Sequence, residues 1–314
     1  MDSRAYVFIF PIERSADIPA DFRPAIKDLQ FETGVFLPQD DANWFTRAPE
    51  YPARVLLLNR ERLHIIPHPT SRESRLELAL HELNQLEVGH ILLLGWIALH
   101  ASATNICLPY NTRASKPLDH FVERVAERWL PEPNGSSADT PAVFGAERDI
   151  KFNYLLRYSL VSGELPEAVF FSPPLPFREK TLVFKRLSVR PGHLLATTSR
   201  GRLLWATDEH KRRYERYAAI ARSARLSLLQ HSELRTVIDH HELVLAFAGN
   251  RTWQIPIYAH SSAAGQFCQW LNECASASAM RAPGELTSVR PQPVGGKKPH
   301  PSTCQPHNNA GSQI

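Results

Sequence analysis

VLLLNRERLHII at residues 55–66 and LLATTSRGRLLWA at residues 194–206 are the two stretches that decide the fold. Each places a short polar turn between two apolar runs, which is the pattern of a β-hairpin. Asn59–Leu63 in the first stretch lies opposite Ser199–Leu203 in the second. Because the hairpins can be matched residue by residue, the sequence predicts one module that occurs twice.

The match continues toward the C-terminal end of each copy. WIALHASATNICLPY (Trp96–Tyr110) lies opposite LVLAFAGNRTWQIPI (Leu243–Ile257), with Pro109 against Pro256, and both stretches predict a strand, a turn and a strand. Each copy then ends with apolar residues at helical spacing, which predicts an amphipathic helix with a buried aromatic face. These residues are Leu118, Phe121, Val122, Val125 and Trp129 in the first copy, and Ala264, Phe267, Cys268, Leu271 and Cys274 in the second.

This order of short strands, an N-R-x-R-L or S-R-G-R-L hairpin, a late strand with an I-P or L-P step and one closing helix resembles the bacterial pleckstrin-homology-like (PH-like) or GRAM-like domain. The resemblance covers roughly residues 25–130 and 152–275. It implies an α+β, mainly β fold of two similar bent antiparallel β-barrels, each closed by its C-terminal helix. Glu73–Glu87 departs from this pattern, because it is predicted as helix rather than strand.

Composition predicts where the modules begin and end. Residues 131–146, PEPNGSSADTPAVFGA, have the proline, glycine and serine content of a linker. We therefore expect a first domain at residues 1–130 and a second at 147–275, in which Phe152–Phe171 alternates polar and apolar positions. Residues 276–314 are small, polar and proline-rich, and predict a disordered tail.

The cysteines and the N-terminus suggest a cytoplasmic protein. Cys107, Cys268, Cys274 and Cys304 form no CxxC pair, which fits a reducing compartment. The apolar run Ala5–Ile12 lies between charged residues without a cleavage site, and predicts a strand rather than a signal peptide.

One window is almost long enough to cross a membrane. Ile91–Leu108 has no charged residue, yet its matched stretch in the second copy contains Asp239, Glu242 and Arg251. A membrane span would contradict the repeat, so we expect a cytoplasmic protein, with peripheral membrane association as the alternative.

Positive charge is concentrated in one segment of the second copy. Arg178–Arg225 contains 13 basic and 4 acidic residues. The leading interpretation of this cluster is a solvated charged face or a surface that meets the acidic first domain. An anionic lipid surface is the first alternative, and a nucleic-acid site is the second. The candidate binding residues are Lys185, Arg186, Arg200, Arg202, Lys211, Arg212 and Arg213.

Motifs for catalysis or metal binding are weak. Asp239–Glu242 reads DHHE, but adjacent residues on a strand point to opposite faces, so we interpret it as a polar hairpin tip. His81 and Glu82 begin a zinc-protease motif whose second histidine is replaced by Gln85. The sequence therefore predicts no catalytic residue, no metal and no cofactor.

The leading hypothesis is a non-enzymatic interaction or scaffold protein that holds an unidentified protein partner at strand edges or barrel loops. Reversible binding to anionic membranes through residues 178–225 is the first alternative. An enzyme of unidentified reaction is the second, and a nucleic-acid partner is less favoured than either the protein or the membrane.

Overall fold

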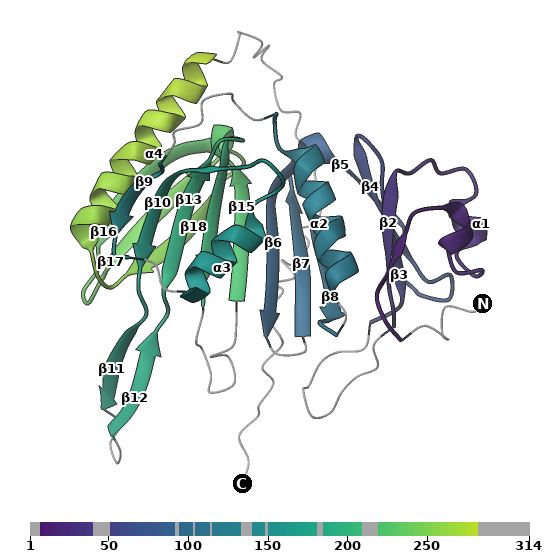
Figure 1. The fold of residues 1–314 in the computed structure, drawn as a ribbon, viewed down its shortest axis with the longest axis horizontal. Helices are drawn as coiled ribbons and strands as arrows, with labels where there is room; N and C mark the ends of the chain where they lie inside the picture. Colours follow the sequence, from purple (N-terminus) through teal and green to yellow (C-terminus); the bar gives the residue numbers. More distant parts are fainter. Residues whose placement is uncertain are drawn as a thin grey trace, which may run out of the picture.

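A computed structural model of the protein describes residues 7–39, 51–91, 94–102, 104–113, 115–132, 140–147, 150–180, 185–208 and 219–281. The fold is mainly β, with four helices and four sheets among these residues (Figure 1). The described strands do not close into a barrel, so the expected barrels remain unconfirmed.

The first half begins with a five-stranded antiparallel sheet in the order β1-β2-β3-β4-β5, followed by strands β6, β7 and β8 and by helix α2. A short helix, α1, lies between β1 and β2. The bounds are β1 (Phe10–Ile12), α1 (Arg23–Ile26), β2 (Thr33–Leu37), β3 (Arg54–Leu58), β4 (Arg62–Pro67), β5 (Leu76–Ala79), β6 (Leu83–Ile91), β7 (Leu94–Ala101), β8 (Asn105–Asn111) and α2 (Lys116–Trp129).

The second half repeats this order with insertions. Four strands, β10, β13, β14 and β15, precede a three-stranded sheet, β16-β17-β18, and helix α4. Strand β9, helix α3 and the hairpin β11–β12 are additional. The bounds are β9 (Ala142–Gly145), α3 (Ile150–Ser159), β10 (Pro166–Ser172), β11 (Leu175–Lys180), β12 (Lys185–Arg190), β13 (His193–Thr198), β14 (Arg202–Thr207), β15 (Ala219–Arg225), β16 (Leu229–Thr236), β17 (His241–Phe247), β18 (Arg251–Ile257) and α4 (Ser261–Arg281).

The two predicted hairpins form β3–β4 and β13–β14. In the first turn the side-chain oxygen of Asn59 accepts the backbone N–H groups of Glu61 and Arg62, at 3.0 and 2.7 Å. In the second, Gly201 supplies the positive φ, +62°, that the tight turn requires. The polar residues between the apolar runs therefore form turns, as the sequence predicted.

A short 3₁₀ helix follows β5 in the first half and β15 in the second, and leads into the next strand. It spans Leu80–Glu82 in the first half and Leu226–Leu228 in the second. The first backbone N–H of each 3₁₀ helix donates to a carbonyl of the hairpin turn, Leu80 to Glu61 and Leu226 to Gly201, both at 2.7 Å. These paired hydrogen bonds show the two halves repeating in detail.

The halves share one continuous sheet. Strand β15 of the second half pairs antiparallel with β6 of the first, from Ala219 opposite His90 to Ala224 opposite Gln85. The result is an eight-stranded sheet in the order β8-β7-β6-β15-β14-β13-β10-β9 (Figure 1). We call the β6–β15 pairing the seam.

The closing helices bury the aromatic faces that their spacing predicted. Phe121 and Trp129 of α2 are buried, and the Trp129 indole N–H donates to the Leu83 carbonyl at 2.7 Å. In α4, Phe267 and Leu271 are fully buried. Each helix thus packs its apolar face on the core of its own half.

Four local assignments made from the sequence differ from the structure. Glu73–Glu87, predicted as helix, contains β5, a 3₁₀ turn and the start of β6. The predicted linker contains β9, which pairs parallel with β10, and the first residues of the alternating stretch Phe152–Phe171 belong to helix α3. Helix α4 continues to Arg281, past the expected start of the tail, and residues 282–314 lie outside the described part of the chain.

Cys268 and Cys274 are free thiols. The expected reducing compartment stays a prediction.

Candidate functional site

Of the seven residues of the predicted anionic site, the structure describes the side chains of Arg200 and Arg202. Lys185 and Arg186 belong to β12. Lys211, Arg212 and Arg213 lie outside the described residues. The other two predicted ligands, Arg200 and Arg202, are in the interior.

Arg202 is bound within the fold rather than exposed to a ligand. Its guanidinium pairs with Glu164, from Nε to Oε1 at 3.0 Å and from Nη2 to Oε2 at 2.5 Å, and the two side chains are 3% and 0% exposed. Glu164 also accepts the hydroxyl of Thr198 at 2.5 Å and the backbone N–H of Val161 at 2.9 Å. Arg202 is therefore a structural residue, because ligand binding would require breaking this buried pair.

Arg200 joins the two halves. Its guanidinium donates to the carbonyls of Glu127 and Pro131 at 2.9 and 2.8 Å, at the C-terminal end of α2. Arg225 does the same at the carbonyl of Trp129, at 3.0 Å. Two cations of the second half thus satisfy the last carbonyls of a helix in the first half, where a positive charge is favourable.

The hairpin β11–β12 extends away from the body of the molecule (Figure 1). Its base is held by Arg190, whose guanidinium pairs with Asp239 at 3.1 Å and lies 4.2 Å from the Tyr258 ring centroid and 5.0 Å from that of Phe177. Asp239 and His240 of the DHHE segment lie in the predicted hairpin tip, whereas His241 and Glu242 are the first residues of β17, which follows β16. Among the described residues, no cluster of three or more potential ligands could hold a metal.

Strand register pairs Arg178 with Leu187, Glu179 with Arg186 and Lys180 with Lys185 along the hairpin. Together with Arg190, the two strands contain five basic residues and one acidic residue.

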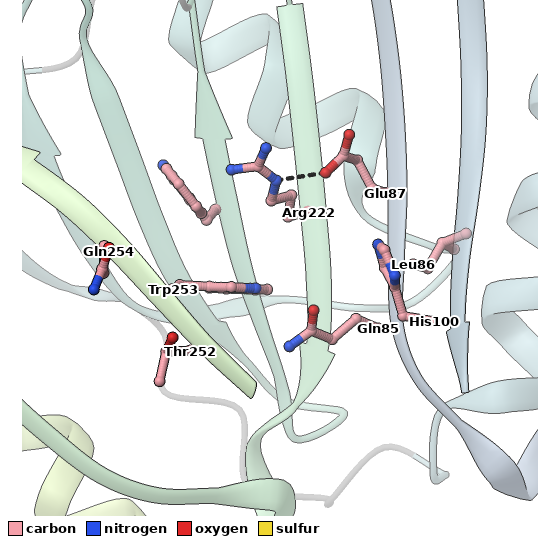
Figure 2. Close-up of a pocket in the computed structure, with 9 residues that line it drawn as sticks. Gln85, Leu86, Glu87, His100, Arg222, Thr252, Trp253 and Gln254 are labelled. Atoms are coloured by element: carbon pink, nitrogen blue, oxygen red, sulfur yellow. Dashed lines mark hydrogen bonds and ion pairs between the residues drawn. The ribbon is translucent and has the colours of Figure 1, made fainter. Parts of the chain in front are cut away.

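A separate cavity of about 360 Å³ lies at the seam (Figure 2). Its floor comes from strands of both halves that are neighbours in the eight-stranded sheet, and β18 forms its opposite wall. We call it the seam cavity. It is lined by Gln85, Leu86 and Glu87 of β6, His100 of β7, Trp205 of β14, Arg222 of β15, and Thr252, Trp253 and Gln254 of β18.

A ladder of side chains crosses the floor of the seam cavity. Trp205, Arg222 and Glu87 lie directly opposite one another on β14, β15 and β6. The Arg222 guanidinium lies 4.4 Å from the Trp205 ring centroid, and its Nε donates to Glu87 Oε2 at 2.5 Å. The other carboxylate oxygen of Glu87 accepts the Trp96 indole N–H at 2.7 Å. Both oxygens of the one acid in the lining are thus occupied.

Two side chains in the cavity have N–H donors without a hydrogen-bond partner among the described residues. Gln85 is 8% exposed, and its Nε2 has no hydrogen-bond partner among the described residues. In Figure 2 its amide points from β6 toward Thr252 and Trp253. The terminal nitrogens of Arg222 face away from Glu87 (Figure 2), and the described part of the chain supplies no hydrogen bond to them. An unsatisfied buried donor costs free energy, so its retention indicates a role.

Histidines beside the cavity are held neutral. Burial lowers the pKa of His100, whose Nδ1 lies 3.1 Å from Asn105 Oδ1, and the positive charge of Arg251 lowers it further. His193, behind Trp205, has its pKa lowered to about 3, first by burial and then by the charge of Arg222. Its Nδ1 accepts the Trp205 indole N–H at 3.4 Å. The cavity therefore gains no positive charge from these rings near neutral pH.

The sequence did not indicate this cavity. Gln85 entered the sequence analysis only as a replaced metal ligand, and Arg222 only as one cation in a basic segment. Their proximity depends on the pairing of β6 with β15, which joins residues 135 positions apart in the case of Arg222 and Glu87. A hydrophobic pattern read along one strand carries no information about such a pairing.

Comparison with known proteins adds no identification. No family model matches the chain, and no curated protein matches it. Among the helices of the described residues, none is both long enough and apolar enough to cross a membrane.

Proposed function

We propose that this protein is a non-enzymatic interaction protein built from two PH-like modules, and that it binds anionic membrane surfaces reversibly through the β11–β12 hairpin. The PH-like assignment is supported by the order that both halves share: β2–β5 in the first half and β10, β13, β14 and β15 in the second are each followed by three strands and a closing helix. The hairpin β11–β12 is an insertion between β10 and β13.

Charge is the observation that carries the proposal. The chain has 36 basic and 32 acidic residues, an excess of four. Residues 175–190 contain five basic residues and one acidic residue, which is also an excess of four. The hairpin alone thus carries an excess of positive charge equal in size to the net charge of the chain. Clustered cations near an anionic lipid surface contribute about 1 kcal/mol each.

Apolar residues favour a membrane over a nucleic acid. The hairpin strands also contain Pro176, Leu187 and Val189, of which Pro176 and Val189 are exposed, Val189 by 40%. Apolar side chains gain free energy at a lipid interface, whereas a groove that tracks nucleic acid uses cations with aromatic platforms.

The test is cosedimentation with vesicles of phosphatidylcholine alone and of phosphatidylcholine with phosphatidylserine, at low and physiological salt. One variant changes Arg178, Lys180 and Lys185 to Gln. A control variant changes Lys27, Arg72 and Arg113 to Gln, which are exposed in the first half. Both variants lose the same net charge.

We expect the hairpin variant to bind anionic vesicles about 100-fold more weakly, since three cations at about 1 kcal/mol each correspond to roughly two decades. The control should bind like the wild type, and salt should weaken binding because exposed charges are screened over about 8 Å. Equal binding by the two variants would refute the hairpin as the site. Tighter binding to a DNA duplex than to anionic vesicles would refute the membrane, and no binding to either would favour a protein partner.

A further inference from the structure

We propose that the seam cavity is a binding site for a small organic carboxylate. This site is independent of the hairpin, because the cavity lies between the halves and contains none of the hairpin residues. Its volume, about 360 Å³, is at the lower end of the range for small-molecule sites, about 300 to 1,000 Å³.

The cavity contains hydrogen-bond donors that have no acceptor in the described part of the chain. Gln85 Nε2 is buried without a partner, and Arg222 uses Nε for Glu87 while its terminal nitrogens remain without one among the described residues. The terminal edge of a guanidinium presents two parallel N–H groups that match the two oxygens of a carboxylate. The ligand must therefore supply acceptor oxygens.

The charges in and beside the cavity also favour a carboxylate. Arg222 lines the cavity, and Arg251 lies next to its rim, where it donates to Asn105 Oδ1 and to the Ala101 carbonyl, both at 2.8 Å. Glu87 is the one acid in the lining. Two cations and one anion leave an excess of one positive charge, which a monoanion neutralises. A carboxylate fits this balance better than a doubly charged phosphate.

The ladder of Trp205, Arg222 and Glu87 makes its own contacts without Gln85. The stack of Arg222 on Trp205 and its pair with Glu87 account for the seam without Gln85. If the cavity served only to join the halves, an apolar residue at position 85 would be the better choice, because it would remove a buried unpaired donor. A ligand that accepts a hydrogen bond from Gln85 explains why an amide is there.

The experiment follows the indole N–H signals of the six tryptophans by NMR in the full chain. The probes are acetate, N-acetylglycine and benzoate, with benzamide as the uncharged counterpart of benzoate. Trp253→Phe assigns the signal of the tryptophan on the β18 wall. We expect at least one carboxylate to shift the Trp205 and Trp253 signals, and benzamide to leave them unchanged.

Gln85→Leu then separates a ligand site from a purely structural cavity. We expect it to weaken carboxylate binding at least tenfold, since the lost hydrogen bond is to a charged acceptor, while the thermal midpoint stays equal or rises. Gln230→Leu, at an exposed position of β16, is the matched control and should bind like the wild type.

Two results would overturn the proposal. One is that none of the three carboxylates shifts the Trp205 and Trp253 signals. The other is that Gln85→Leu binds the probe as tightly as the control, or that it unfolds at a lower temperature without a change in affinity, which would make Gln85 a structural residue.

Discussion

Replacing Arg202 tests whether this residue stabilises the fold or serves as a ligand-binding cation. Arg202→Met removes one partner of a pair whose side chains are 3% and 0% exposed, and leaves the Glu164 carboxylate buried with the Thr198 hydroxyl and the Val161 N–H as its remaining donors. Breaking a buried pair from one side costs about 3 to 5 kcal/mol, because the other charge is left uncompensated. For a chain of this size, that corresponds to a fall in Tm of roughly 5 to 10 °C.

The repeat supplies a matched control. Arg62 begins β4 as Arg202 begins β14, but it forms an exposed pair with Glu77, with side chains 52% and 37% exposed. Arg62→Met should therefore cost no more than about 1 kcal/mol. A third variant, Arg202→Met with Glu164→Gln, removes both charges and should lose less stability than Arg202→Met alone.

Urea unfolding followed by circular dichroism measures all three free energies of unfolding. The reasoning would be refuted if Arg202→Met and Arg62→Met lost similar stability, because burial would then not matter. It would also be refuted if the double variant were less stable than Arg202→Met, since removing the stranded carboxylate should relieve the cost.

Two further predictions concern pH and glycine. His193 has a folded pKa of about 3, below its ordinary value of 6.5, so the unfolded chain binds a proton that the folded chain does not. The free energy of unfolding should therefore fall as pH drops from about 6.5 toward 3, by up to about 1.4 kcal/mol per pH unit. Urea titrations at successive pH values should show a smaller decline for His193→Gln. A decline as steep as that of the wild type would contradict the assignment to His193. At the seam, a Cβ on Gly89 would lie 2.2 Å from the Trp96 ring, so Gly89→Ala should cost about 1 to 3 kcal/mol. A Cβ on Gly265 of α4 would lie 4.0 Å from its nearest neighbour, a Leu234 side-chain atom, so Gly265→Ala should stabilise the fold by up to about 1 kcal/mol. Calorimetry measures both variants. If both raised or both lowered the thermal midpoint, the explanation from local packing would be contradicted.

The parts of the fold that were predictable are those determined by neighbours in the sequence. The β3–β4 hairpin was readable because the turn residue Asn59 and its flanking apolar runs are contiguous. The α2 face was readable because its buried residues recur every three or four positions. Both depend on contacts made within about fifteen residues.

Glu73–Glu87 shows how the same approach fails. Leu76, Leu78 and Leu80 follow the period of two that a strand requires, but Leu83 and Leu86 follow at steps of three. The 3₁₀ turn at Leu80–Glu82 produces that change of step, because it turns the chain from β5 into β6. A strand, a tight turn and a second strand together imitate the spacing of a helix.

The seam cavity was beyond prediction for a different reason. Its floor requires β15 to pair with β6 in one register, and nothing in either strand specifies the other as its partner. Arg222 and Glu87 become a pair only after that choice is made. Counting cations along the chain has a different weakness, since it cannot separate the buried Arg202 from a residue on a projecting hairpin.

The last difference between the halves explains why the continuous sheet stops where it does. Strand β6 accepts β15 at its edge, whereas the corresponding strand of the second half, β16, is covered by α4. There the Asn272 side chain makes the two hydrogen bonds that a neighbouring strand would make to Ser232. Its Oδ1 accepts the Ser232 N–H at 2.9 Å, and its Nδ2 donates to the Ser232 carbonyl at 2.9 Å. An unpaired strand edge is a template for association, and natural sheets block such edges.

Asn272→Ala should therefore lower stability by about 1 to 3 kcal/mol, because it leaves two backbone groups of Ser232 unpaired, and should promote concentration-dependent association. Light scattering across a dilution series measures this association, with Gln269→Ala on the exposed side of α4 as the control. If Asn272→Ala were as stable and as monodisperse as the control, the helix alone would close the edge. The Asn272 hydrogen bonds would then be a consequence of helix packing rather than the reason that the strand accepts no partner.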